Sequence, residues 1–548
     1  MEDLQSRLFT DGHVYNVSSS SCKIIIRKGY ACPSQHIPID NMKDYLTVDH
    51  SIELQSLVST TTQSDSLPNY DKGLSTRKLC VTATLTSWVL CILLLVFGVI
   101  QLEQSLDITP PTSIVRVIAS LLLNFSITLC VEALGYVHSI SLRWGLWQEQ
   151  RLAYNSNLRL FSSTKLRTSV ANTALVNLFN AVSLIICYAG VSQIFLDEDL
   201  VNDDTSQLQS SPTGAINAYA LLATGIGIGV QALIASMVLC APKHILSWSS
   251  NPLNTTLACM STGQLERRPG RSLLAVWALD LRSEGCTAVY SHQCSLRQID
   301  GSVRHIIRFL WCTTSLALIW AVIVLVISLL GLGGGDVLQG PTLTSGNVSI
   351  GLGIFALSSG SYYATVGIGS LILIAIIQAF VTMATHIAEV VVNRARDESV
   401  WRQAYAHDKG THFSTSSTKT AITSWQYLAL STMKPLVHWM FSLSVQPSDS
   451  RSIIVIKFGY LPEFLLFLLL VALAYLIMSI ARSSLKGVQP ASWGHLQTLA
   501  DLVDDWGTAD DKKLYWGDKG VREDGVRFAG TSAVVGEVGK IRETALYR

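Results

Sequence analysis

The chain has 548 residues, of which 49% are hydrophobic and 14% are charged, and its formal net charge is +1. A soluble domain carries about 25% charged residues, so the composition, with a mean hydropathy of +0.37, excludes a chain built around one soluble core. The nearly neutral charge gives no basis for binding nucleic acid.

Residues 1–76 form a polar N-terminal region, rich in Ser, Thr and Asp, that we expect to be cytosolic and largely disordered. Lys72, Arg77 and Lys78 stand just before the first apolar run and predict a cytosolic N-terminus. No signal peptide pattern opens the chain, so we expect the first span to act as its own insertion signal.

Eight apolar segments follow, and seven are long enough to cross a bilayer, which takes about 20 residues. These seven segments are 79–100, 114–139, 170–195, 216–241, 309–330, 364–392 and 464–481. The remaining segment, 425–445, contains Lys434 and His438, and a charge there costs several kcal/mol unless it faces the bundle interior or a wet cavity. We predict an all-α polytopic membrane protein with eight transmembrane helices, or seven if 425–445 lies in the interface or re-enters.

Connections that are rich in lysine and arginine alternate along the chain with connections that contain neither residue. The second-to-third, fourth-to-fifth and sixth-to-seventh connections are basic, whereas residues 101–112, 196–215 and 331–363 contain neither residue type. The positive-inside rule therefore places the basic connections in the cytosol, in a plasma membrane or an endomembrane. If 425–445 crosses, the tail 482–548 is cytosolic as well.

Cysteines and one sequon agree with this topology. The cysteines lie in the spans or on the reducing side, so we expect no structural disulfide. Asn347, in the sequence Asn-Val-Ser, is the sequon predicted to face the lumen. It is the plausible glycosylation site, and an unoccupied sequon is the alternative.

Polar residues inside the spans are the candidate functional residues. They are Glu132, Asn124, Asn177, Asn180, Gln231, Gln378, His386, Glu389, Lys434 and His438. Such residues mark solute, ion or proton paths, but they also join helices as polar clamps, and we favour the clamp interpretation. Gly225 and Gly229 have the spacing that permits close helix approach.

Residues 143–167 combine arginines with Trp144, Trp147 and several leucines. This pattern predicts a helix that continues from the second span along the inner leaflet and binds anionic lipid headgroups. The alternative is an ordinary basic flank of a span.

No catalytic or metal-binding motif stands out. Cys286, His292 and Cys294 lack a fourth ligand, and the acidic residues of the tail lack the spacing of a calcium loop. We therefore expect no enzyme activity and no cofactor or metal.

The sequence of the tail, residues 482–548, predicts a small α+β module that docks against the membrane domain. Residues 492–506 place Leu496, Leu499 and Leu502 at helical spacing, with aspartates mostly on a solvated opposite face that could engage the basic connections. Residues 513–516, 526–528 and 545–547 read as short strands.

Several segments resemble a block shared by multi-pass membrane proteins of filamentous fungi. They include Tyr136–Trp144, Arg151–Phe161, Pro435–Trp439, Gly494–Thr498 and Tyr515–Gly517. The resemblance implies membrane residence and a shared architecture, and it carries no activity, because no function is established for that family.

Two functions are compatible with these observations. The first is binding or transport of a small solute through the helical bundle, and the second is a membrane-anchored scaffold or sensor that acts through its cytosolic connections and tail. An intramembrane enzyme has the least support, because no paired carboxylates or metal ligands are expected to converge at one depth.

Overall fold

A computed structural model describes most of the chain. It covers residues 67, 69–104, 113–165, 167–195, 216–278, 286–287, 293–331, 348–352, 362–405, 410–413, 423–450, 453–507, 513–523 and 525–547. Residues 65–548 form one compact unit, to which the description below applies. The predictions for most of the N-terminal region and for Asn347 lie outside the described residues.

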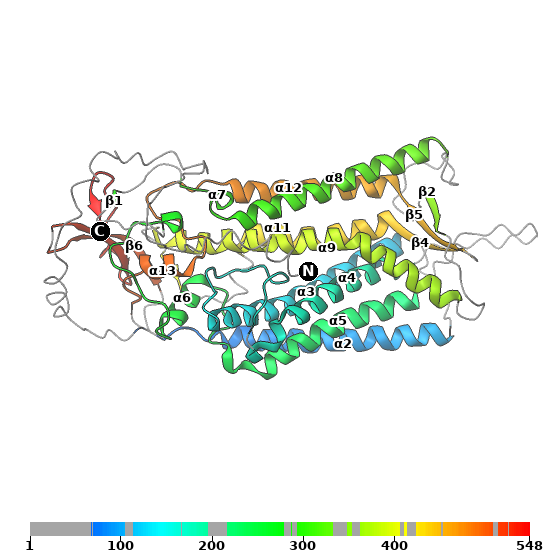
Figure 1. The fold of residues 1–548 in the computed structure, drawn as a ribbon, viewed down its shortest axis with the longest axis horizontal. Coiled ribbons are helices and arrows are strands. Elements are labelled where there is room, and N and C mark those ends of the chain that lie inside the picture. The colour runs from blue at the N-terminus through cyan, green and yellow to red at the C-terminus, as the bar shows by residue number, and fades with distance from the viewer. Residues whose placement is uncertain are drawn as a thin grey trace, which may run out of the picture. The chain divides into compact units, whose positions relative to one another are not determined.

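Eight long helices form a bundle (Figure 1). They are α2 (Leu74–Gln104), α3 (Ser113–Gln148), α4 (Ala174–Ser192), α5 (Ala218–Cys240), α8 (Gly301–Leu329), α9 (Tyr362–Arg402), α11 (Trp425–Ser444) and α12 (Tyr460–Arg482). Among the described residues, all of these helices except α11 are long and apolar enough to cross a membrane. Large apolar side chains such as Leu93 and Leu122 are more than half exposed on the outside of the bundle, as a lipid-facing surface requires. The fold is thus that of a multi-pass membrane protein.

Short elements lie in the connections and the tail. The helical ones are η2 (Arg167–Asn172), η3 (Pro242–His244), α6 (Pro252–Met260), η4 (Val276–Ala278), α7 (Leu296–Ile299), η5 (Gln403–Tyr405) and α13 (Leu496–Leu502). The strands are β1 (Cys286–Thr287), β2 (Val348–Leu352), β3 (Thr411–His412), β4 (Val445–Ser450), β5 (Ile453–Phe458), β6 (Lys513–Val521), β7 (Arg527–Ser532) and β8 (Leu546–Tyr547).

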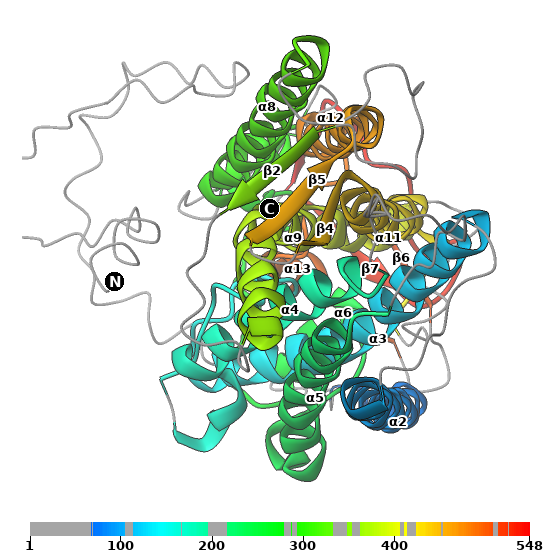
Figure 2. The same ribbon diagram turned by 90° about the vertical axis from the view of Figure 1, so that its right-hand side faces the viewer.

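Helix α11 runs between the two ends of the bundle. It packs against α3, α9 and α12 and continues directly into β4. Strand β4 pairs with β5, and β5 also pairs with β2 from the α8–α9 connection. Figure 2 views the bundle from the end that carries this three-stranded sheet. The C-terminal end of α11 therefore lies beside the α8–α9 connection, at the end opposite to the tail (Figure 1).

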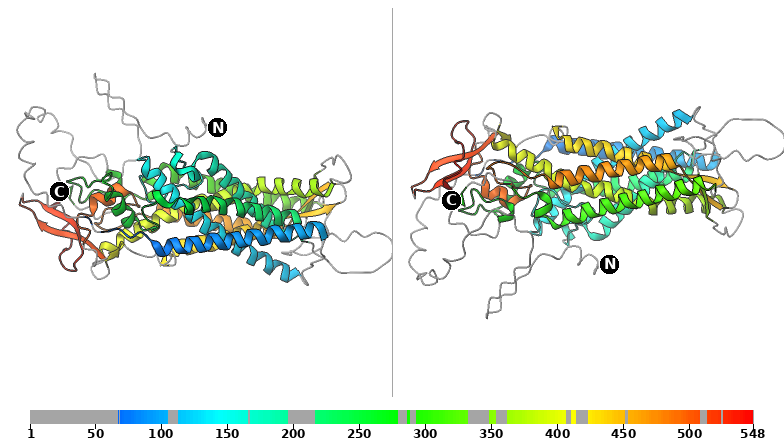
Figure 3. Two further views of the ribbon diagram at one scale, coloured as in Figure 1. Left: turned by 90° about the horizontal axis from the view of Figure 1, so that it is seen from below. Right: turned by 90° about the horizontal axis from the view of Figure 1, so that it is seen from above.

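The tail shares a second sheet with two connections. Its strand order is β1-β8-β7-β6-β3, in which β1 comes from the α5–α8 connection and β3 from the α9–α11 connection. Strand β8 is parallel to β7 and antiparallel to β1. In Figure 3 the red and orange tail elements lie together at one end of the helices. The tail is therefore held by the connections on its own side of the bundle.

Helix α5 packs closely against two neighbours through its glycines. A Cβ atom at Gly225 would lie 2.9 Å from Leu95 of α2, and one at Gly227 would lie 2.8 Å from Cys187 of α4. The predicted close approach at Gly225 and Gly229 is confirmed, since a Cβ at Gly229 would also lie 2.9 Å from Cys91 of α2.

The predicted inner-leaflet helix over 143–167 is wrong. Helix α3 ends at Gln148, and the following residues up to 165 form no helix. Arg143 and Trp144 are buried, and they donate hydrogen bonds to the carbonyls of Ser249 and Ser247, at 2.7 Å each. These side chains join α3 to the α5–α8 connection instead of facing lipid, although Arg151 and Lys165 remain exposed.

The helix predicted over 492–506 is shorter than expected, because α13 covers only Leu496–Leu502. Its aspartates are also less solvated than expected. Asp501 is buried and forms a 2.6 Å ion pair with Arg268 of the α5–α8 connection. The tail helix thus engages a basic connection, and the cost of burying the carboxylate is offset by a charge-assisted pair.

Candidate ligand-binding cavity

A cavity of about 290 Å³ lies inside the bundle. Its wall is formed by α2, α3, α9, α11 and the segment 155–159 that follows α3. The lining residues come from the beginning of α2 and α11 and from the later turns of α3 and α9, so the cavity lies in the half of the bundle nearer the tail. A volume of this size holds a small metabolite.

Three charged residues from three helices meet in this cavity. The ammonium group of Lys434 on α11 lies 2.7 Å from Glu132 Oε1 on α3, and it also contacts Glu389 Oε1 on α9. The lysine side chain is 1% exposed, whereas the two glutamates are 19% and 20% exposed and face the cavity. The charge that makes 425–445 a poor span by composition is thus compensated by two carboxylates.

His386 and Arg159 extend this group. His386 Nδ1 lies 3.2 Å from Glu389 Oε1 and 3.8 Å from Glu132 Oε1. Arg159 Nη2 lies 3.4 Å from the same Nδ1 atom. The guanidinium occupies the space beside Gly135 of α3, where a Cβ atom would come within 1.9 Å of its Nη1. A side chain at position 135 would displace Arg159.

Glu132, His386 and Glu389 are also a candidate ligand set for a divalent cation. One ligand atom from each of the three residues lies within 4.8 Å of the others. The expectation that no such groups converge is therefore wrong. In this structure, however, the cation beside both carboxylates is the Lys434 ammonium, so a metal ion could bind there only if the lysine moved away.

A second polar layer lies next to the cavity, one turn further along α11. The ring of His438 stacks on Tyr188 of α4 at 3.6 Å, with an interplanar angle of 10°. His438 Nδ1 lies 3.0 Å from Gln378 Nε2, and its Nε2 lies 3.4 Å from Thr385 Oγ1. Polar groups therefore continue from the cavity toward the β2-β5-β4 end of the bundle.

The other predicted intramembrane residues lie outside the cavity wall and make local contacts. Asn124 and Gln231 donate to carbonyls of their own helices, at Ser120 and Gly227. Asn177 donates to Ser162, and Asn180 contacts His138. Asn177 and Asn180 thus act as clamps between segments, and the contacts of Asn124 and Gln231 stay within one helix, whereas Glu132, His386, Glu389 and Lys434 line one cavity.

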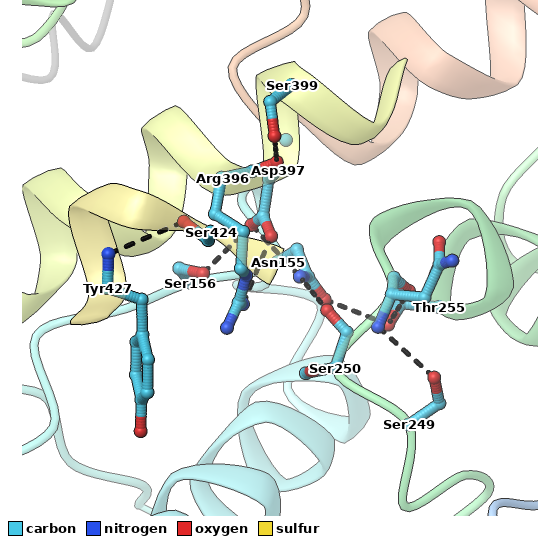
Figure 4. Close-up of polar contacts among 12 residues, drawn as sticks. Asn155, Ser156, Ser249, Ser250, Thr255, Arg396, Asp397, Ser399, Ser424 and Tyr427 are labelled. Atoms are coloured by element: carbon cyan, nitrogen blue, oxygen red, sulfur yellow. Dashed lines mark hydrogen bonds and ion pairs between the residues drawn. The ribbon is translucent and has the colours of Figure 1, made fainter. Parts of the chain in front are cut away.

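The cavity wall is connected to the tail. Asn155 and Ser156 line the cavity and donate to the buried carboxylate of Asp397, at 3.0 Å and 2.9 Å (Figure 4). The Asn155 backbone N–H donates to the carbonyl of Gly494 in the tail at 2.9 Å. Gly494 is required there, because its φ is +75° and a Cβ would lie 2.8 Å from Asp397 Oδ2.

Next to this connection, His495 caps α13 with its imidazole. Its Nδ1 accepts the Thr498 backbone N–H at 3.2 Å, which requires the neutral ring. Burial and the nearby Arg268 charge lower the pKa of His495 to about 4. The cap is therefore in its accepting form at neutral pH.

Sequence reasoning missed Arg143, Arg159 and Tyr188 as residues of the bundle interior. The sequence pattern predicts both arginines at the lipid surface, because they lie in a basic, tryptophan-containing flank. A usable signal was Gly135, one turn after Glu132 on the same face of a helix, where a glycine leaves room for a long side chain. Comparisons with known protein families, curated proteins and solved structures found no match.

Proposed function

We propose that the helical bundle binds a small polar solute in this cavity and that the protein is a non-enzymatic binding or transport protein of the membrane. The supporting observation is the cavity of about 290 Å³ whose wall presents two partly exposed carboxylates around one buried lysine. A buried ion cluster is weak evidence for stability, because apolar residues of similar volume stabilise as well or better. Charged groups facing a cavity inside a membrane protein are typical of a substrate path.

Transport is favoured by the polar groups beyond the cavity. The layer of His438, Tyr188 and Gln378 continues toward the opposite end of the bundle. A small void of about 20 Å³ lies near that end, beside Arg116, Ser192 and Gln446, and it has room for about one water molecule. This arrangement suits a transport path that runs from the cavity, in the half of the bundle nearer the tail, toward the other end. With eight crossings, the tail side is cytosolic.

The experiment measures solute binding and uptake by the purified full-length protein in reconstituted vesicles, with cationic, neutral and anionic solutes supplied in turn. We expect Glu132→Gln to change binding or flux at least tenfold for the solute that the wild type accepts, with a loss for a cation and a gain for an anion. Glu523→Gln removes an exposed carboxylate of the tail and is the matched control. The proposal fails if the wild type binds none of the solutes, or if both variants behave alike.

A scaffold or sensor is the second candidate. It is favoured by the sheet that joins the tail to two connections and by the Asn155–Gly494 hydrogen bond, which links that tail to the cavity wall. A sensor predicts that a bound solute changes protease protection of the tail without crossing the membrane. A transporter predicts accumulation of the solute inside the vesicles.

A further inference from the structure

We infer that the cavity binds an anionic group, a carboxylate or a phosphate, and that the Arg159 guanidinium holds it. This inference rests on the proposed function and names the chemical class of its solute. Arg159 is a buried cation that the protein leaves incompletely paired.

Arg159 is 7% exposed, yet in the part of the chain that the structure describes no carboxylate lies within 4.0 Å of it. Its hydrogen-bond contact is with His386 Nδ1, an atom that also faces Glu389 Oε1. A single ring nitrogen cannot accept from arginine and donate to glutamate at the same time. When Nδ1–H donates to Glu389, the five guanidinium donors of Arg159 lack an acceptor from these residues.

The other cavity cations are already engaged. Lys434 contacts both carboxylates, and Arg143 donates to the carbonyls of Asn155 and Ser249. Arg396 contacts Asp397 at 3.2 Å, although its buried Nε has no partner among the described residues. Arg159 is therefore the cavity cation that has no carboxylate partner in the described part of the chain, and an unpaired buried charge is costly enough that a bound anion would be stabilising.

The charge balance of the wall points the same way. The cavity is lined by four cations, Arg143, Arg159, Arg396 and Lys434, and by two carboxylates, which leaves an excess of two positive charges when His386 is neutral. Asp397 beside Arg396 reduces this excess to one. One monoanionic group would neutralise it.

The rest of the wall indicates what accompanies the anion. Leu79 and Ala83 of α2, Leu158, Val390 of α9 and Leu430 of α11 give the cavity an apolar part. A short-chain carboxylate or a phosphate with a small apolar substituent fits this combination. The phosphate of a lipid headgroup has the same chemistry as a free phosphate, so the test separates these sources.

The test uses the full-length protein in a neutral detergent and follows thermal unfolding by tryptophan fluorescence at constant ionic strength. The probes are butyrate and inorganic phosphate, with neutral butyramide and cationic butylammonium as comparisons. We expect a saturable rise in Tm with at least one of the anions for the wild type, and an apparent Kd at least tenfold weaker for Arg159→Gln. Arg151→Gln, in the same segment but at an exposed ion pair, should behave like the wild type.

Arg159→Lys covers the case in which Arg159→Gln does not fold. Lysine keeps the charge but not the two-pronged donor geometry, so we expect weaker anion binding by the folded variant. Nanodiscs of phosphatidylcholine with and without phosphatidate form the lipid arm, and stabilisation by phosphatidate alone would assign the site to a headgroup phosphate.

Equal shifts for wild type and Arg159→Gln would overturn the inference. Binding of butylammonium or butyramide that depends on Glu132, without any anion effect, would overturn the inference and leave the proposed function intact. No binding by any probe would reject both.

Discussion

At the scale of single residues, the cavity is governed by the balance between desolvation and pairing of charge. Lys434 is separated from Glu132 by 302 residues in sequence, yet its ammonium lies 2.7 Å from that carboxylate. The identities of Glu132, Glu389 and Lys434 as intramembrane polar residues follow from the sequence, because each interrupts an apolar run. Their convergence does not, because nothing in a single sequence specifies which faces of α3, α9 and α11 meet.

Lys434→Met should destabilise the protein by about 3–5 kcal/mol, because it leaves two partly exposed carboxylates of the bundle interior without their shared cation. Glu132→Gln should lower the free energy of unfolding by a smaller amount, since Lys434 still forms its ion pair with Glu389. Chemical denaturation in detergent, followed by tryptophan fluorescence, measures the difference. The variant Glu132→Gln should be at least as stable as Lys434→Met, and the reverse order would contradict the assignment of Lys434 as the shared partner.

His495 should make stability depend on pH. Its pKa is about 4 in the folded protein and about 6.5 when unfolded, so the unfolded chain binds the proton first as the pH falls. The contribution of neutral His495 to stability is complete above pH 6.5. It is lost between pH 6.5 and 4, which lowers the free energy of unfolding by at most about 3 kcal/mol.

The variant His495→Asn keeps a residue that caps helices well but does not titrate. Its Tm should therefore fall less than that of the wild type between pH 7.5 and 4.5. If the Tm of both proteins fell equally over this pH range, the protonation of His495 would not be the cause of the pH dependence.

At the scale of elements, apolar runs predict helices well because the bilayer fixes their length and composition. The run 216–241 became α5 at Ala218–Cys240, and 425–445 became α11 at Trp425–Ser444. The sheet formed by β2, β5 and β4 was not predicted, because Val348 pairs with Phe458 across a distance that no local pattern encodes. The prediction of an inner-leaflet helix over 143–167 is wrong for a different reason. The basic and tryptophan residues are present in the sequence, but Arg143 and Trp144 bind protein carbonyls and not lipids.

The contact between α4 and α5 gives an element-scale prediction. Gly227→Leu should destabilise the bundle by about 1–3 kcal/mol, because even its Cβ would lie 2.8 Å from Cys187 and from the carbonyl of Ser183. Gly301→Ala is the control, since the nearest atom there, at 3.5 Å, is the end of the Arg304 side chain. Thermal unfolding in detergent gives the Tm of both variants. Equal values would show that α4 and α5 can move apart without a loss of stability.

At the scale of the whole molecule, the predicted topology can be tested by modification and cleavage. We expect Asn347→Gln to remove a glycan-dependent shift on a gel, because this sequon belongs to the connection predicted to face the lumen. A protease site placed after Arg548 should be cut only by cytosolic protease, since the tail shares a sheet with the basic connections. A glycan at Asn254, or cleavage from outside intact cells, would contradict this orientation.

The position of β8 in its sheet has a consequence for biosynthesis. Leu546–Tyr547 pair with β1, about 260 residues earlier in the chain, and Tyr547 donates a 2.9 Å hydrogen bond to Asp518. The ribosome delivers these two residues after α12 and the other described helices, so the sheet can close only when translation has passed them. A nascent chain that stops at residue 545 should insert its helices normally and yet leave β1 and β7 as open edges. Such a product would expose unpaired strand edges on the tail side of the bundle, which chaperones or proteases on that side can recognise.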